Sequence, residues 1–385
     1  MSIEARPEAF AVDPDVAVAS TIDKRFYLDE AVFALARERI FSRTWQWIGD
    51  LADVTAPMSL SPRYMLAGCL DQPLLLTRDS SGVLRCLSNV CTHRGNLLAT
   101  AAGRADRIRC GYHSRCFDLA GRMTFMPEFQ QTQNFPAPRD DLANIPFDTW
   151  GPHGFASIAP LKPLDAFLGD IKSRLGWLSL ADFSPAPALG REYEFDAHWA
   201  LYVENYLEGL HIPFVHPGLM KTLEIGGYRD ELYRYATLQL APAREGQTAF
   251  DLPASSPDHG QRIAAYYYWV FPGLMLNFYP WGLSLNLVVP LGPARTRVLF
   301  RSFVRDEALM GSGAGAALDE VEMQDEAVVV AVQRGLRSSF YAGGRYSASR
   351  ERGTHHFHRL LCEFMAQPPT FGAQSERDPK ARTGP

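Results

Sequence analysis

The chain has 385 residues, and its 38 Lys and Arg residues against 43 Asp and Glu residues give a formal net charge of −5 at pH 7. This length can bury a sizeable core in one or two domains, and six cysteines are too few for a disulfide framework. The slightly acidic balance gives no indication of a nucleic-acid or anionic-membrane partner. The sequence shows neither a signal peptide nor a run near the roughly 18 apolar residues of a membrane span. We therefore expect a globular protein of the cytoplasm.

The first half of the chain is predicted to be mostly β-structure. Residues 1–22 are expected to be flexible, and apolar residues at helical spacing predict a helix over residues 24–48. Residues 58–157 contain short β segments broken by turn residues, which is typical of an all-β region. The proline- and leucine-rich passage at residues 159–188 is the best candidate for a domain boundary.

The second half mixes helices with an antiparallel sheet. Helices are predicted at residues 196–211 and 319–336, and the glycine-rich stretch at 311–316 is interpreted as a connector. Between the two helices, short turns separate four predicted strands of a meander, at residues 263–271, 274–279, 283–289 and 296–304.

Two cysteines and two histidines form the first candidate site, as Cys91-x-His93 and Cys110-x-x-His113. Four such ligands could hold one tetrahedral zinc ion. A Rieske-type [2Fe–2S] cluster instead needs one cysteine and one histidine from each of two loops, so that both cysteines bind one iron and both histidines the other. The spacing supplies this partition, and we favour the cluster over zinc.

A second candidate site lies in residues 204–218. Asn205, Glu208 and His211 recur every three residues and should share one face of the predicted helix. A proline after His211 should break the regular turn and let His216 swing back toward the same point. Two histidines and one carboxylate are the ligands of non-haem Fe(II) oxygenases. We take His211 and His216 as iron ligands, and Glu208 and Asn205 as candidate catalytic residues.

The third iron ligand is predicted on the helix at residues 319–336. At about 100° per residue, Asp325 falls in the middle of an apolar stripe, where a buried carboxylate needs a partner such as a metal ion. Glu322, at the edge of that stripe, is the alternative, whereas Glu326 is expected to point into solvent.

The two cysteine–histidine segments closely resemble the Rieske motif of ring-hydroxylating and related Rieske non-haem iron oxygenases, and the resemblance covers residues 25–365. That family commonly has Gly-Trp after the second histidine, where this chain has Ser114 and Arg115. In many relatives an aspartate at the position of Glu208 bridges, across a subunit contact, a Rieske histidine of one protomer and an iron-binding histidine of the next. A glutamate there is similar to choline, carnitine and proline-betaine oxygenases.

The resemblance implies an α+β fold with two domains. An all-β Rieske [2Fe–2S] domain would occupy residues 23–165, and a helix-plus-antiparallel-sheet catalytic domain of the helix-grip type residues 166–371, before a disordered tail at 372–385. The cofactors implied are the [2Fe–2S] cluster and a mononuclear Fe(II), with O2 as cosubstrate. NAD(P)H would act through a separate flavin reductase, and the working unit would be a homotrimer.

The substrate stays open between two classes. Aromatic residues alternate along strands at residues 266–281, so about half should be core and the others are available for a pocket. They could hold a quaternary ammonium compound by cation–π attraction or stack on an aromatic acid. A rival of another class is a Rieske electron-transfer protein without oxygenase activity. His355, His356 and His358 are expected at a surface or helix end, and Cys86 and Cys116 as ordinary buried cysteines.

Overall fold

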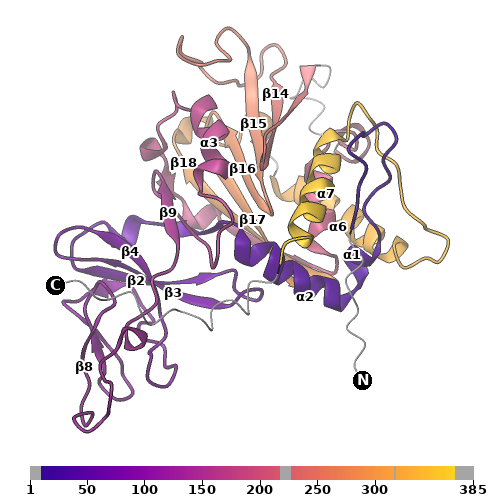
Figure 1. Ribbon diagram of the computed structural model, residues 1–385. Helices are drawn as coiled ribbons and strands as arrows, with labels where there is room; N and C mark the ends of the chain where they lie inside the picture. The colour runs from indigo at the N-terminus through magenta and orange to yellow at the C-terminus, as the bar shows by residue number, and fades with distance from the viewer. Residues whose placement is uncertain (1–9, 217–226, 316–317, 369–385) are drawn as a thin grey trace.

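The computed structural model describes residues 10–216, 227–315 and 318–368. Figure 1 shows a smaller part made of short strands beside a larger part built on an antiparallel sheet. One hydrophobic core cluster runs from Ile22 to Met365 and includes residues of both parts. The structure thus has the α+β composition that the sequence predicts. Among the described residues, we find no helix that is both long and apolar enough to cross a membrane.

The predicted single helix at residues 24–48 is wrong. Two helices, α1 (Arg25–Leu28) and α2 (Glu30–Arg39), occupy its start, and the strand β1 (Gln46–Asp50) occupies its end. Asp29 separates the helices because its backbone is extended and its side chain accepts hydrogen bonds from the first amides of α2. Local capping therefore outweighs the apolar periodicity.

Residues 10–22 are not loose, although the sequence predicts flexibility up to residue 22. The Thr21 amide donates to the Gly344 carbonyl at 3.0 Å, and Arg345 donates to the Ala19 carbonyl at 3.1 Å. Ala19 and Ile22 are buried. This segment therefore packs against the C-terminal part of the chain. Residues 1–9 and the tail at 372–385 lie outside the described residues.

The smaller part is all-β, as predicted, and consists of three small antiparallel sheets. One of these sheets contains β1, which follows α2 in the chain and pairs with β10. This pairing joins the N-terminal helices to the smaller part. The strands after β1 are β2 (Ser59–Met65), β3 (Gln72–Arg78), β4 (Leu84–Ser88), β5 (Gly103–Arg104), β6 (Ile108–Arg109), β7 (Cys116–Phe117), β8 (Met123–Phe125), β9 (Phe147–Trp150) and β10 (His153–Ala156).

The predicted boundary passage contains the helix α3 (Asp165–Arg174). Phe167 of this helix stacks on Tyr235 with ring centroids 4.5 Å apart, and Arg174 pairs with Asp258 at 2.7 Å. The passage is therefore packed onto the larger part rather than being a free linker. The short strand β11 (Ser184–Pro185) ends it and pairs with the large sheet.

The larger part is an eight-stranded sheet, and its predicted meander is confirmed. Tight antiparallel register joins consecutive strands from β14 to β18. The strands are β12 (Arg191–Phe195), β13 (Arg229–Leu232), β14 (Ala236–Pro242), β15 (Ile263–Val270), β16 (Leu274–Tyr279), β17 (Gly282–Gly292) and β18 (Arg295–Val304).

Four helices of this part carry or support the second candidate site: α4 (Trp199–Tyr206), α5 (Ile212–Val215), α6 (Leu318–Gly335) and α7 (Arg352–Met365). Figure 1 shows α6 and α7 beside the sheet. Helix α6 confirms the predicted helix at residues 319–336, within one residue at each end.

The sequence predicts His355, His356 and His358 at a surface or a helix end; they lie in the first two turns of α7, and the surface alternative is wrong for His355 and His358. Both of these side chains are buried. His358 contacts Tyr27 at 3.2 Å and Glu204 at 3.1 Å through Nε2, which joins α1, α4 and α7. These histidines are therefore part of the packing between helices.

Candidate functional site

The first cysteine–histidine loop is a tight turn between residues 91 and 96. The Cys91 amide donates to the Asn96 carbonyl at 2.8 Å, and the Gly95 amide donates to the Cys91 carbonyl at 2.9 Å. Gly95 has a φ of 71°, a left-handed conformation that a glycine adopts without steric cost. The turn holds Cys91 and His93 on one side of the loop.

The second loop, residues 110–115, repeats this hydrogen-bond pattern. The Cys110 amide donates to the Arg115 carbonyl at 2.8 Å, and the Ser114 amide donates to the Cys110 carbonyl at 3.1 Å. Ser114 occupies the left-handed position with a φ of 61°. Two equivalent turns thus face each other, and each offers one cysteine and one histidine.

The four side chains fit a Rieske cluster. The His93 and His113 rings lie with centroids 4.8 Å apart, and the two cysteines are both about 2 % exposed and in contact. The Nδ1 atoms of both histidines are buried and find no hydrogen-bond partner among the described residues. A buried nitrogen without a partner is costly unless it binds something else, such as a metal. The pairing of two thiols beside two imidazoles matches a cluster with two irons.

The second candidate site brings two histidines and a carboxylate together. Nε2 of His216 lies 2.9 Å from Oδ1 of Asp325, and Nε2 of His211 lies 3.6 Å from the same oxygen. Within the described ranges, only these three residues group three potential metal ligands around one point, all within 4.8 Å of one another. The four cluster residues do not form such a group, which fits two irons better than one zinc ion.

The predicted continuous helix at residues 196–211 is wrong, but His211 and His216 still meet Asp325 at one point. Helix α4 ends at Tyr206, so Asn205, Glu208 and His211 do not share one helical face. A turn follows, in which the Glu208 carboxylate accepts hydrogen bonds from the amides of Leu210 and His211. This side chain competes with the helix for backbone donors and ends it before the proline does.

Each histidine of the triad is held through its outer nitrogen. Nδ1 of His211 lies 2.6 Å from Oε1 of Glu208, and Nδ1 of His216 lies 2.7 Å from Oε1 of Gln324. Such partners fix the ring orientation and leave Nε2 free for a metal. The sequence analysis did not identify Gln324 as a site residue. Its only signal in the sequence is its position next to Asp325 on α6.

The carboxylate of the triad is oriented by an amide. Asn205 Nδ2 donates to Oδ1 of Asp325 at 2.6 Å across the contact between α4 and α6. The burial of His216 lowers its pKa, but the hydrogen bonds that its ring donates to Asp325 and Gln324 outweigh this and raise the pKa overall. The site therefore stabilises positive charge, as a cation site should.

Glu322 lies in the buried face of α6 rather than at its edge, and Asp325 lies beside that face. Glu322 is 5 % exposed, and its Oε2 accepts a hydrogen bond from Tyr202 at 2.7 Å. Burial raises the pKa of Glu322 to about 8. Glu326 is also not in open solvent, since its Oε1 is buried, and this burial raises its pKa. Packing against α4 thus turns Glu322 rather than Asp325 into the core. Val332, a member of the apolar stripe, is 43 % exposed as a result.

A cavity of about 120 Å³ opens beside the triad. Its floor is the large sheet, where Gln239, Tyr267 and Asn277 stand in register across β14, β15 and β16. The predicted alternation of aromatics is confirmed, since Tyr267 faces the cavity while its neighbours Tyr266 and Tyr268 pack in the core. Six aromatic rings line the cavity: Tyr202, Tyr206, Tyr228, Tyr267, Tyr279 and Phe300.

The phenols of this cavity are neutral hydrogen-bonding groups. Burial raises the pKa of Tyr267 to about 12 and holds the pKa of Tyr206 and Tyr228 well above the usual value. Tyr206 donates to Asn277 at 2.7 Å and Tyr228 donates to Gln239 at 3.0 Å. Among its described lining residues, the cavity has no lysine or arginine.

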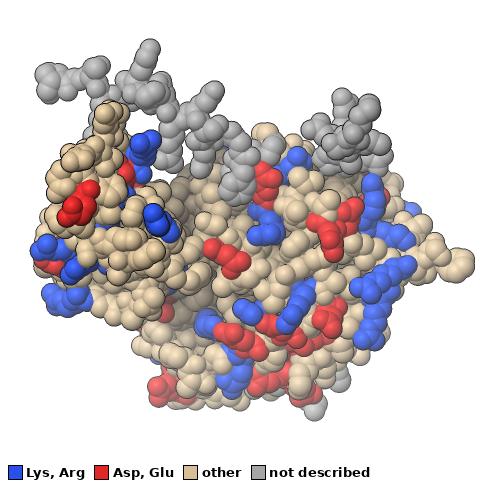
Figure 2. Space-filling model, turned by 90° about the horizontal axis from the view of Figure 1, so that it is seen from below, with Lys and Arg blue, Asp and Glu red and all other residues tan. Residues whose placement is uncertain are grey.

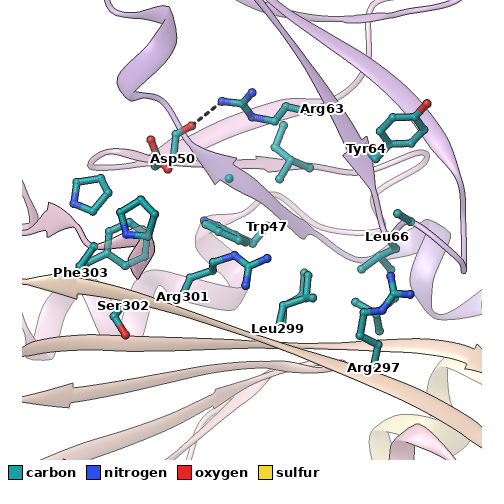
Figure 3. Close-up of a pocket in the computed structure, with 18 residues that line it drawn as sticks. Trp47, Asp50, Arg63, Tyr64, Leu66, Arg297, Leu299, Arg301, Ser302 and Phe303 are labelled. Atoms are coloured by element: carbon teal, nitrogen blue, oxygen red, sulfur yellow. Dashed lines mark hydrogen bonds between the residues drawn. The ribbon is translucent and has the colours of Figure 1, made fainter. Parts of the chain in front are cut away.

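A second cavity, of about 390 Å³, lies between the two parts of the molecule (Figure 3). Trp47 of β1 and Phe303 of β18 line it, and Phe303 lies on the face of β18 opposite Phe300. Basic and acidic side chains are interspersed on the face of the molecule that Figure 2 shows. Three arginines of this cavity likewise have acidic partners. Each is paired at 2.6 Å: Arg63 with Asp53, Arg297 with Glu194 and Arg301 with Glu192. With its charges neutralised, this cavity is the weaker candidate.

Two family models match the sequence. The Rieske [2Fe-2S] domain matches residues 45–136, and the ring hydroxylating alpha subunit (catalytic domain) matches residues 186–367. The first match contains both cysteine–histidine loops, and the second contains His211, His216 and Asp325.

Full-length relatives resemble the chain throughout. The chloroplastic choline monooxygenase of Arabidopsis thaliana is 30% identical over 372 residues, covering 91% of this chain and 84% of the relative. The carnitine monooxygenase oxygenase subunit of Escherichia coli (strain K12) is 26% identical, covering 93% and 96%. A solved quaternary ammonium Rieske monooxygenase has the same fold, with a TM-score of 0.73, 23% identity and coverage of 92% of this chain and 97% of that chain.

Proposed function

This chain belongs to the Rieske non-haem iron oxygenases, and from that premise we propose that it is the terminal oxygenase of a system that oxidises a small quaternary ammonium compound. Enzymes of this family use a Rieske [2Fe–2S] cluster and a mononuclear iron. When bound, the cluster supplies single electrons, and an iron with open positions supplies O2 activation. Hydroxylation of a C–H bond consumes O2, two electrons and two protons, and releases water.

We assign each centre to residues of the chain. Cys91, His93, Cys110 and His113 would hold the cluster, because the two equivalent turns bring two thiols and two partnerless imidazole nitrogens together. His211, His216 and Asp325 would hold the iron.

The residues around the triad have positioning roles. Glu208 holds the Nδ1 proton of His211, Gln324 accepts that of His216, and Asn205 fixes the carboxylate of Asp325. Glu208 is also the residue that would connect the two centres, because it contacts Nδ1 of His211, whose Nε2 would hold the iron. Replacing Glu208 should therefore slow electron transfer more than it weakens iron binding.

The main evidence for the substrate class is the aromatic cavity beside the triad. Neutral phenol rings attract a cation through their faces, and the cavity also presents the carboxylates of Glu208 and Asp325. The named relatives act on choline and carnitine, and both compounds carry a quaternary ammonium group. Binding such a group next to the iron would place its methyl C–H bonds, or those of the adjacent carbon, at the reacting position.

An aromatic acid is the second candidate, and the cavity supports it less. An aromatic acid lacks the cation that the ring faces attract, and its carboxylate would find no lysine or arginine among the described lining residues. A Rieske electron-transfer protein is the third candidate, and it gives no reason for the grouping of His211, His216 and Asp325.

We further propose that the oxygenase is a homotrimer in which the cluster of one chain serves the iron of its neighbour. The strands around the second cluster loop, β6–β8, lie at the tip of the smaller part, away from α6 (Figure 1). Exposed apolar side chains stand beside both sites, Tyr112 and Phe125 near the cluster loops and Leu210 and Phe214 near Glu208. A subunit contact would cover both sets. Inter-subunit electron transfer is described for the related quaternary ammonium monooxygenase.

Electrons from NAD(P)H would arrive through a separate flavin reductase. The carnitine relative is named as an oxygenase subunit, which implies other components of its system. The cytoplasmic location stays a prediction from the sequence, and the plant relatives are named as chloroplastic.

The test begins with anaerobic purification, visible and EPR spectra, and iron and zinc content per chain. About three irons and a Rieske-type reduced signal are expected. Choline, L-carnitine and benzoate are then compared for substrate-dependent O2 uptake with a surrogate reductase. Uptake with an ammonium compound supports the proposal, whereas uptake with benzoate alone would reassign the substrate. A colourless zinc protein would overturn the whole assignment.

A further inference from the structure

Arg115 is a buried cation beside the cluster loops. It stands two residues after His113, where the resembled family commonly has a tryptophan, and its side chain is only 2 % exposed. An arginine is almost never fully buried without a specific reason, and its guanidinium stays charged in proteins. This residue is therefore a fixed positive charge inside the smaller part.

The guanidinium ties the second cluster loop to the first. Its Nη1 donates at 2.7 Å to the hydroxyl of Thr92, the residue between Cys91 and His93. Its Nη2 donates to Oδ1 of Asp140 at 3.3 Å, and Thr92 donates to the Asp140 carbonyl at 2.7 Å. The side chain thus links both turns that carry the cluster ligands.

Aromatic rings enclose the same charge. The guanidinium carbon lies 5.7 Å from the ring centre of Phe129 and 5.3 Å from that of Phe135. Phe129 also contacts the His93 ring edge-to-face at 5.6 Å. Arg115, Phe129 and His93 thus form one packed group at the first cluster loop.

We propose that Arg115 sets the reduction potential of the Rieske cluster, with Asp140 as its counterweight. Reduction adds one negative charge to the cluster, and a buried cation nearby stabilises the reduced form. Asp140 opposes this effect because its negative charge pairs with the guanidinium. The inference rests on the proposed cluster ligands.

The test is a redox titration of the cluster followed by EPR. Arg115→Gln removes the charge and keeps a hydrogen-bond donor; we expect its reduced-to-oxidised ratio to fall about tenfold at a given potential, which is about 59 mV for one electron. Asp140→Asn keeps the hydrogen-bond acceptor and should shift the potential in the opposite direction. Arg115→Lys should lie close to the wild type.

Arg107→Gln is the matched control, since this arginine is 62 % exposed and solvent screens its charge. An unchanged potential in Arg115→Gln with an intact cluster spectrum would overturn the inference. If that variant does not assemble the cluster, Asp140→Asn decides, and an unchanged or lower potential there would overturn it equally. A wild-type protein without any Rieske signal would instead refute the proposed function.

Discussion

Oε1 of Glu208 lies 2.6 Å from Nδ1 of His211, while Nε2 of the same ring faces Asp325 at 3.6 Å. One imidazole therefore connects a carboxylate outside the metal site to a carboxylate inside it. Because Glu208 is bound by the turn that ends α4, its position depends on the backbone and not on a flexible side chain alone. This relationship makes separate predictions for His211 and Glu208.

Replacing His211 by alanine should abolish turnover and leave the Rieske spectrum intact. The triad would lose one of its three ligands, so the iron content should fall from about three to about two per chain. Iron analysis and EPR of the reduced protein measure both effects. His259→Ala is the control, since His259 contacts the Leu252 carbonyl and lies outside the triad. Loss of the cluster signal in His211→Ala would contradict the two-site assignment.

Exchanging Glu208 for glutamine should slow electron transfer more than it lowers iron loading. The amide keeps the shape but removes the charge that stabilises the Nδ1 proton of His211, and partners of this kind typically change activity about 10–100-fold. Single-turnover oxidation of the reduced cluster, compared with iron content, measures the difference. Glu245→Gln on an exposed loop is the matched control. Equal cluster oxidation rates in wild type and variant would exclude the bridge.

Removing the ring of Tyr267 should weaken the binding of a quaternary ammonium substrate. Tyr267→Leu loses a cation–π contact of about 0.5–2 kcal/mol, so KM should rise about 2- to 30-fold. Tyr267→Phe keeps the ring face and should stay near the wild type. The comparison uses choline and its uncharged analogue 3,3-dimethylbutan-1-ol, whose binding should not change between leucine and phenylalanine variants. An equal loss for both compounds would point to packing instead of charge.

The buried Glu322 should make the metal-free protein less stable as the pH rises. Its pKa is about 8 in the folded state and about 4.3 in an unfolded chain, so the folded state binds more protons between these values. Stability is then fully present below about pH 4 and is lost as the pH rises toward 8, by up to about 1.4 kcal/mol per pH unit.

Thermal unfolding from pH 5 to pH 8 measures this dependence. Glu322→Gln should flatten the profile, whereas Glu320→Gln, on an exposed position of α6, should leave it as in the wild type. A profile that stays equally steep in Glu322→Gln would show that other groups cause the pH dependence.

Local signals in the sequence were sufficient to propose both sets of candidate ligands. Cys91, His93, Cys110 and His113 stand in two short segments, and turns this short largely determine which way their side chains point. The β-meander was likewise predictable, because alternating apolar residues and turn residues lie within one continuous stretch.

Contacts between distant segments decided the rest. The end of α4 depends on the Glu208 side chain competing for backbone amides, and the orientation of α6 depends on its packing against α4, which buries Glu322 beside Tyr202. Gln324 and His216 are 108 positions apart in the sequence, and Arg115 and Asp140 are 25 positions apart, yet each pair is joined by a hydrogen bond. Periodicity within one element carries no information about its rotation against a neighbour, so only the tertiary structure could reveal these contacts.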